Sequence, residues 1–88
     1  DVVMSNANVN RTEKGFANLE LCIVQDIFLN ETAKGFAHVF LPACSSFEKD
    51  GTFMNAERRV QRIRKAVEPV GSSRTDWEIV AAVARAMG

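Results

Sequence analysis

The sequence has 88 residues, of which 47% are hydrophobic and 25% are charged, with 11 basic and 11 acidic side chains. This length fits one small domain, and a composition this apolar excludes an intrinsically disordered chain. The longest apolar runs, residues 21–24 and 79–84, are far shorter than the roughly 20 residues that a membrane-spanning helix needs. The first residues, 1–4, have no signal-peptide pattern. The sequence begins with Asp1 rather than Met, so we expect a piece of a longer protein.

The cysteines and the histidine indicate structural rather than catalytic roles. Cys22 and Cys44 are far apart and form no CxxC motif, which predicts reduced thiols and a cytoplasmic location. Cys22 lies in an apolar run and is predicted to be buried, whereas Cys44 lies in a loop and is predicted to be more exposed. A single histidine excludes a multi-histidine metal site, and the position of His38 beside a predicted strand favours a structural role.

The zero net charge hides an uneven distribution along the chain. Residues 58–65 contain four arginines, one lysine and no acidic residue, which gives this segment a charge of +5. Two interpretations stay open: a solvated surface with ion pairs to the acidic first half of the chain, or a surface that binds anions. Because no aromatic residue is interleaved with these cations, a nucleic-acid interface is the less favoured interpretation.

The first 20 residues predict a loop followed by a short helix. Residues 1–10 are polar and predict the loop. Asn10, with Glu13 three residues later, forms a variant of the capping box and is predicted to begin the helix. Phe16 and Leu19 are then predicted to face the core.

Residues 21–41 predict a strand, a short helix and a second strand. The first strand, residues 21–25, is continuously apolar up to its polar end at Gln25 and is predicted to be buried on both faces, as in a parallel sheet. Residues 30–34 predict a helix that Asn30 caps, and residues 39–41 predict the second strand, closed by a proline. The interval between the strands is about the dozen residues that a right-handed crossover between parallel strands requires.

The middle of the chain is predicted to contain a loop, one regular element and a linker. Residues 42–51 predict a loop that ends in a tight turn, and residues 68–73 predict a linker. Between them, Val60, Ile63 and Val67 follow helical spacing, although residues 59–67 also alternate imperfectly as a strand does. Periodicity alone therefore favours a helix over residues 57–67.

A C-terminal helix is the most strongly indicated element. Thr75 and Glu78 form a capping box, and Asp76 lies at the positive N-terminal end of the helix dipole. Gly88 is predicted to supply the C-terminal cap. An inward apolar stripe is predicted from the spacing of Trp77, Val80, Ala81 and Ala84, widened by Ile79, Val83 and Met87.

The sequence contains no catalytic constellation, but four polar residues occupy positions that suit a nucleotide. Gln25 and Asp26 follow the first predicted strand, where ligands bind in open α/β sheets. A carboxylate there can accept two hydrogen bonds from a ribose diol or from the N1–H and N2–H₂ edge of guanine. Lys49 precedes a predicted turn, and Asp76 opens the last helix. Each alone is more often a cap or a solvated charge, but together they point to a nucleotide half-site.

The order of motifs resembles the molybdopterin-dependent oxidoreductases over almost the whole chain. The matching stretches are VQDIFLNETA (residues 24–33), VFLPA (39–43), FEKDGTF (47–53) and NAERRVQ (55–61), followed by Trp77. The likeness is strongest to the alpha, catalytic, subunits of molybdenum- or tungsten-dependent formate dehydrogenases. Nitrate reductases share the pattern more loosely.

This resemblance implies a fold. Residues 1–88 are expected to be a single segment of a cofactor-binding domain in a much larger subunit. The expected fold is α/β, with an incomplete Rossmann-like parallel sheet flanked by short helices, an extended arm and a C-terminal helix. In this scheme residues 55–67 are largely extended, against the helical periodicity, and we adopt the extended expectation.

The resemblance also implies a cofactor and its contacts. The family binds molybdopterin guanine dinucleotide with molybdenum or tungsten, and Gln25 and Asp26 match a strand-end pair that touches the guanosine. Lys49 matches a lysine near the cofactor, and Asp76 matches another nucleotide contact. Which of the two carboxylates contacts guanine and which contacts ribose stays open.

The resemblance implies that the chemistry belongs to absent parts of the enzyme. The full enzyme is expected to oxidise formate to CO₂ and to pass electrons through iron–sulfur clusters. Cys22 and Cys44 match neither the cluster cysteines nor the metal-binding cysteine or selenocysteine, so we expect no catalytic residue, no metal ligand and no turnover in this chain. Expected partners are the other domains of the subunit and electron-transfer subunits, without nucleic acid or a membrane segment. Two alternatives are a segment of a nitrate reductase-type enzyme and a free-standing interaction or anion-binding module that uses residues 58–65.

Overall fold

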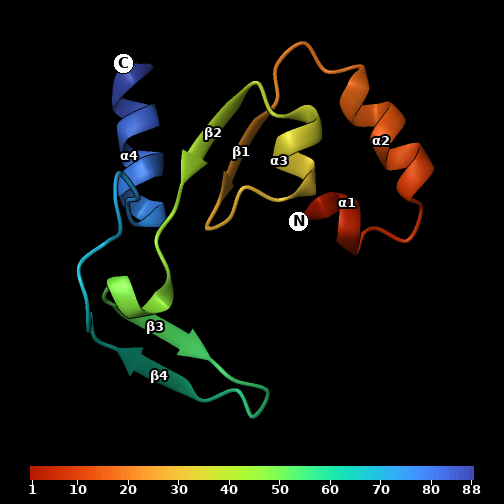
Figure 1. The fold of residues 1–88 in the computed structure, drawn as a ribbon. Helices are drawn as coiled ribbons and strands as arrows, with labels where there is room; N and C mark the ends of the chain where they lie inside the picture. Colours follow the sequence, from red (N-terminus) through yellow and green to blue (C-terminus); the bar gives the residue numbers. More distant parts are fainter. The chain divides into compact units, whose positions relative to one another are not determined.

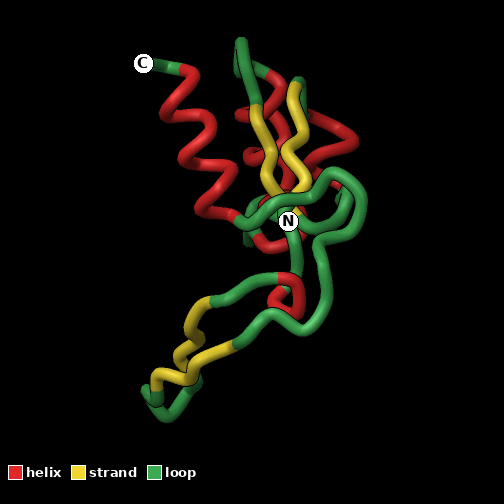
Figure 2. Tube along the Cα trace, turned by 90° about the vertical axis from the view of Figure 1, so that its left-hand side faces the viewer, coloured by secondary structure: helices red, strands yellow, loops and turns green.

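The computed structural model describes residues 1–88 and shows two compact units, Asp1–Pro42 and Ala43–Gly88. Each unit contains one two-stranded sheet and short helices (Figures 1 and 2). The sheet is parallel in the first unit and antiparallel in the second. The predicted α/β fold is therefore confirmed, whereas a Rossmann-like sheet stays a prediction. No helix combines the length and the apolar character needed to cross a membrane.

The first unit contains the predicted strand–helix–strand motif. Strands β1 (Ile23–Asp26) and β2 (Val39–Pro42) pair in parallel, with Ile23 opposite Val39, and helix α3 (Glu31–Phe36) connects them. The side chain of Asn30 caps α3, because its Oδ1 atom accepts a hydrogen bond from the Ala33 N–H at 3.0 Å. The prediction of two parallel strands joined by a capped helix is confirmed.

Two helices precede this motif, where the sequence predicted one. Helix α1 (Val2–Ser5) lies within the predicted loop, and helix α2 (Val9–Ala17) begins before Asn10. The N-cap of α2 is Asn8, whose Oδ1 atom accepts a hydrogen bond from the Arg11 N–H at 3.2 Å. The loop over residues 1–10 and the cap at Asn10 were therefore wrong, because an equivalent capping side chain lies two residues earlier.

Helix α2 contributes one aromatic contact to the first unit. The rings of Phe16 and Phe36 stack with their centroids 5.4 Å apart, and Phe16 is half-buried. Leu19 lies beyond the end of α2 and is 46% exposed, so its predicted inward position was wrong.

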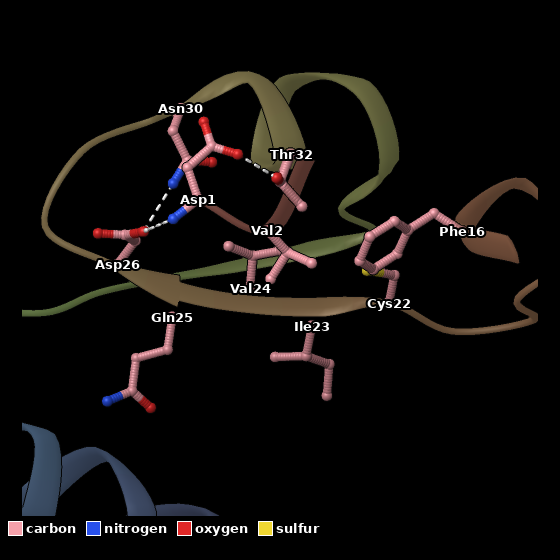
Figure 3. Close-up of a pocket in the computed structure, with 10 residues that line it drawn as sticks. All are labelled: Asp1, Val2, Phe16, Cys22, Ile23, Val24, Gln25, Asp26, Asn30 and Thr32. Carbon is pink, nitrogen blue, oxygen red and sulfur yellow. Dashed lines mark hydrogen bonds and ion pairs between the residues drawn. The ribbon is translucent and has the colours of Figure 1, made fainter. Parts of the chain in front are cut away.

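Strand β1 is not buried on both faces. Ile23 is 51% exposed and Gln25 is also exposed, whereas Val24 and Asp26 are half-buried. Figure 3 shows the reason, since Val24 and Asp26 point to the side occupied by Val2 while Ile23 and Gln25 point away from it. The helices of this unit cover one face of the strand pair, and the prediction of a doubly buried strand was wrong for this chain.

The second unit begins with a short helical turn and a β-hairpin. The turn η1 (Ser46–Glu48) lies in the predicted loop and precedes strands β3 (Gly51–Met54) and β4 (Val60–Ile63), which pair antiparallel. Within residues 55–67, residues 60–63 are extended as β4, as the family resemblance implied, whereas residues 55–59 form the turn of the hairpin. The helical periodicity was misleading. Val60 is 70% exposed, so the apolar spacing does not face a core in this unit.

Helix α4 (Asp76–Ala86) forms at the predicted place. Glu78 Oε2 accepts hydrogen bonds from the Thr75 N–H at 3.0 Å and from the Thr75 hydroxyl at 2.8 Å, so the capping box is confirmed. Gly88 follows the helix with a φ of +94°, as suits a C-terminal cap. The inward stripe was wrong within this unit, because Ile79 is the one buried residue of α4 while Trp77 is 67% exposed.

The core is small in both units. The buried apolar residues are Cys22, Ala33, Ala43, Cys44 and Ile79, and twenty large apolar side chains are exposed. Both cysteines are free thiols. Cys44 is the most buried of the five residues at 1% exposure, so its predicted exposure was wrong. The Cys44 backbone N–H donates a hydrogen bond to the Arg74 carbonyl at 2.9 Å, which holds the loop against the segment before α4. The burial of the Cys44 side chain raises the pKa of its thiol.

Candidate functional site

The first predicted site residues lie at the carboxyl end of β1, around the carboxylate of Asp26. Its Oδ1 atom accepts a hydrogen bond from the Ile27 N–H at 2.7 Å, and its Oδ2 atom accepts one from the Asn30 amide at 2.6 Å. The side chain is 32% exposed. Because an ionised carboxylate offers about four acceptor positions, Asp26 retains capacity for two donors from a ligand. The same bonds also give Asp26 a local role in the turn after β1.

Gln25 lies next to Asp26 but on the other side of the strand. Figure 3 shows the two side chains pointing in opposite directions, as the alternation along a strand requires. A ligand that contacts both side chains must therefore lie across the end of β1 rather than over one face of the sheet.

A pocket of about 340 Å³ surrounds this strand end and falls at the small end of the range for ligand sites. It combines apolar walls with carboxylate and amide groups (Figure 3). Its lining residues are Asp1, Val2, Phe16, Cys22, Ile23, Val24, Gln25, Asp26, Asn30 and Thr32.

Asp1 and Thr32 also line this pocket, and no sequence motif predicts their place in it. The buried Thr32 hydroxyl donates a hydrogen bond to the Asp1 carboxylate and accepts one from the Val3 N–H at 3.0 Å. The α-amino nitrogen of Asp1 lies 3.8 Å from Asp26 Oδ2. These contacts join residues about thirty positions apart, and no local motif connects them.

The other two predicted residues, Lys49 and Asp76, form an ion pair within the second unit. The Lys49 ammonium donates a hydrogen bond to Asp76 Oδ2 across 27 positions of sequence. The Lys49 side chain is 23% exposed and that of Asp76 is 52% exposed. Asp76 is the first residue of α4, where the helix dipole favours a negative charge. An ammonium group has three donors, so Lys49 can bind an anion while it keeps this pair.

Glu48, the residue before Lys49, is a buried carboxylate that was not predicted from the sequence. It is 7% exposed, and both carboxylate oxygens accept hydrogen bonds from the backbone. The Ser45 N–H donates to Oε2 at 2.6 Å, and the Val70 N–H donates to Oε1 at 2.8 Å. These bonds lower the pKa of Glu48, with the Ser45 N–H as the largest cause. The spacing Ser45-x-x-Glu48 is that of a capping box and is the signal that was available in the sequence.

The lowered pKa of Glu48 predicts acid sensitivity in the second unit. A carboxyl group whose pKa is lower in the folded chain than in the unfolded chain stabilises the fold. This stabilisation is fully present above the pKa of the unfolded chain, about 4.5, and is lost as the pH falls through the pKa of the folded chain. The difference in unfolding free energy between the wild-type chain and Glu48→Gln should therefore be constant above pH 4.5 and shrink below it. Urea unfolding at a series of pH values measures this difference. A difference that is independent of pH would contradict the assignment.

The basic segment, residues 58–65, lies around strand β4 and is exposed except for the half-buried Ile63. Arg59 lies 3.7 Å from a Glu57 carboxylate oxygen, and Lys65 lies 2.8 Å from one of Glu68. The hydrogen bond that the Lys65 ammonium donates to the Glu68 carboxylate raises the pKa of Lys65. Exposed pairs of this kind contribute little to stability, which agrees with a solvated surface.

His38 contacts the backbone rather than a metal-binding group. Its Nδ1 atom accepts a hydrogen bond from the Cys22 N–H at 2.9 Å, next to the start of β1, which agrees with the predicted structural role. Histidine, cysteine, aspartate and glutamate side chains form no group of three or more that could hold a metal ion.

Comparison with known proteins shows the family to which the chain belongs. The chain is 53% identical over 88 residues to the F420-dependent formate dehydrogenase 2 subunit alpha of Methanococcus maripaludis, of which it covers 13%. It is 48% identical over its whole length to a putative formate dehydrogenase of Staphylococcus aureus, of which it covers 9%. A probable oxidoreductase of Bacillus subtilis is 47% identical over 94% of the chain, which covers 8% of that protein. The family profile described as molybdopterin oxidoreductase matches residues 1–86. The chain belongs to the molybdopterin oxidoreductase family.

Proposed function

We propose that this chain is a cofactor-binding segment of a formate dehydrogenase alpha subunit and that it holds the guanosine end of molybdopterin guanine dinucleotide. The family match and the two relatives described as formate dehydrogenases support the enzyme class. When bound, the metal centre of the cofactor supplies the redox chemistry of formate oxidation to CO₂. Iron–sulfur clusters and electron-transfer subunits then belong to parts of the enzyme outside these 88 residues.

The Lys49–Asp76 ion pair is the observation that carries the proposal for the nucleotide. Two residues chosen from the sequence, 27 positions apart, contact each other at the first turn of α4. The pair offers ammonium donors and a carboxylate acceptor next to the positive end of a helix dipole, which suits the mixed charge of a nucleotide. We assign Lys49 to the phosphates and Asp76 to a hydroxyl or base N–H group.

The strand-end residues fit the same class of ligand. Asp26 has acceptor positions beyond those used by Ile27 and Asn30, and Gln25 has both donors and an acceptor on its amide. A ribose diol or a guanine edge presents two neighbouring donors, which one carboxylate can accept. We therefore assign Gln25 and Asp26 to the guanosine part, with β1 and β2 as two strands of a Rossmann-like sheet that other parts of the subunit complete.

The exposed apolar side chains agree with a place inside a larger protein. Ile23 and Trp77 are 51% and 67% exposed, and the chain covers only 13% of the relative from Methanococcus maripaludis. We assign these surfaces to contacts with the remaining domains of the same subunit. The two free cysteines support a cytoplasmic location for that subunit.

Replacing the lysine of the ion pair tests the nucleotide assignment. Lys49→Met is expected to weaken binding of guanosine 5′-diphosphate by about tenfold, because the variant lacks one charge-assisted hydrogen bond. Isothermal titration calorimetry on the 88-residue chain measures the affinity, and amide chemical shifts locate the contacts. The shifts are expected at Gln25, Asp26, Lys49 and Asp76.

Lys65→Met is the matched control, because Lys65 also pairs with a carboxylate but lies in the basic segment. It is expected to leave the affinity within about twofold of wild type, as for a surface pair. The opposite pattern, with loss of binding in Lys65→Met and none in Lys49→Met, would replace the nucleotide site by an anion-binding surface at residues 58–65.

A further inference from the structure

Glu48 fastens the loop that carries Lys49 to the segment that leads into α4. Its carboxylate accepts the Ser45 N–H within the loop and the Val70 N–H from 22 positions away. The carbonyl of Phe47 also accepts the Ala66 N–H at 2.8 Å. The loop is thus held at two neighbouring residues against the segment that continues to Asp76.

The attachment at Glu48 also constrains the next residue, Lys49, and with it the Lys49 ammonium group. Lys49 is extended, with φ −143° and ψ 157°, and directly follows Glu48, the last residue of the η1 turn. Glu48 is 7% exposed, whereas the Lys49 side chain is 23% exposed and ends on Asp76. Because the two residues are adjacent, the hydrogen bonds of Glu48 also hold the backbone from which the Lys49 side chain reaches Asp76.

We propose that Glu48 is a positioning residue that sets the Lys49 ammonium at the first turn of α4 for binding the phosphates of the nucleotide. This inference rests on the proposed function of Lys49. Glu48 itself does not contact the ligand. It acts through the backbone amide of Val70, which ties the loop to the chain that leads into the helix with Asp76 as its first residue.

An amide in place of the carboxylate separates positioning from general stability. In Glu48→Gln one oxygen can accept one backbone N–H, while the new NH₂ group faces the other N–H as a second donor. The loop therefore loses one of its two attachments, and Lys49 loses its fixed position. A Glu48 that served stability alone would weaken ligand binding equally whether or not Lys49 were present.

A double-mutant cycle tests this dependence on Lys49. Binding of guanosine 5′-diphosphate is measured for the wild-type chain, Glu48→Gln, Lys49→Met and the double variant. Glu48→Gln is expected to weaken binding by about fivefold in the presence of Lys49 and by less than about 1.5-fold in the Lys49→Met background, since residues that act through one another are not additive. Glu57→Gln, at a residue whose side chain is 75% exposed, controls for the removal of a negative charge.

A second variant removes the other end of the attachment. Val70→Pro deletes the N–H that Glu48 binds, and the Val70 side chain is 77% exposed, so few side-chain contacts are lost. The same dependence on Lys49 is expected. If Glu48→Gln or Val70→Pro weakens nucleotide binding equally with and without Lys49, the positioning role is overturned. If Lys49→Met itself has no effect on nucleotide binding, the proposed function is overturned instead. If Glu48→Gln does not fold, as judged by amide spectra, the Val70→Pro cycle decides between these outcomes.

Discussion

Asp26→Asn is expected to weaken binding of guanosine 5′-diphosphate by about ten- to a hundredfold, because hydrogen bonds to a charged acceptor contribute more than those between neutral groups. The asparagine keeps the size of the side chain but has one acceptor oxygen, which the Ile27 N–H or the Asn30 amide already engages. The NH₂ group of the asparagine is itself a donor, so it cannot accept the hydrogen bonds that the ligand's N–H or O–H groups donate. Calorimetry on the 88-residue chain measures the loss.

Nucleotide analogues show which part of the guanosine Asp26 contacts. Inosine diphosphate lacks the 2-amino donor of guanine, and 2′-deoxyguanosine diphosphate lacks one ribose hydroxyl. If Asp26 binds the base edge, Asp26→Asn should no longer distinguish the guanosine from the inosine nucleotide. If Asp26 binds the ribose, the variant should no longer distinguish the ribo from the deoxyribo form, and Asp76→Asn should then lose the preference for guanine.

Glu31→Gln provides the control for charge alone. Glu31 is an exposed carboxylate at the start of α3, five residues beyond Asp26. Its replacement should leave the affinity unchanged or slightly improve it, because a nearby negative charge repels phosphate. Unchanged affinity in Asp26→Asn, with the fold intact, would remove Asp26 from the site.

The caps of α3 and α4 were predictable from the sequence, whereas the cap predicted at Asn10 lies at Asn8. Asn30 caps α3 and Glu78 closes the capping box of α4 as their spacing requires, because these hydrogen bonds join residues three positions apart. The same rule applied to Ser45 and Glu48 would have found the carboxylate that holds the Lys49 loop. The Val70 N–H that completes its coordination lies 22 positions away and has no local signal.

Apolar patterns indicated which faces are apolar but not what covers them. The sequence pattern predicted that β1 is buried on both faces and that α4 turns an apolar stripe toward the core. However, Ile23 and Trp77 are exposed in their units. A periodic stripe records the environment of a residue in the whole folded protein, and this chain covers 8–13% of the relatives compared with it. For residues 57–67 the pattern was misleading for another reason, since the spacing of Val60, Ile63 and Val67 favours a helix, whereas residues 60–63 form β4.

The same scarcity of buried side chains makes Ile79 the most sensitive position of the second unit. It is 7% exposed and is the one large aliphatic residue that is buried in either unit. Ile79→Ala is expected to lower the unfolding free energy by about 2–4 kcal/mol, from lost apolar burial and the cavity left behind. Small proteins are typically stable by about 5–15 kcal/mol, so this loss is a large share of the total. Urea unfolding followed by circular dichroism measures it.

Val80→Ala is the matched control for Ile79→Ala, because it shortens the neighbouring β-branched residue on the exposed side of the same helix. Val80 is 61% exposed, so its truncation should cost less than about 0.5 kcal/mol, or nothing once the better helix propensity of alanine is included. Residue-resolved hydrogen exchange adds a second measurement. In Ile79→Ala the amides of Ala43–Gly88 should lose protection more than those of Asp1–Pro42, because the deleted side chain belongs to that unit. Equal costs for the two variants would show that α4 is held by its caps and backbone rather than by Ile79, and the apolar core of the second unit would then have to be assigned to other residues.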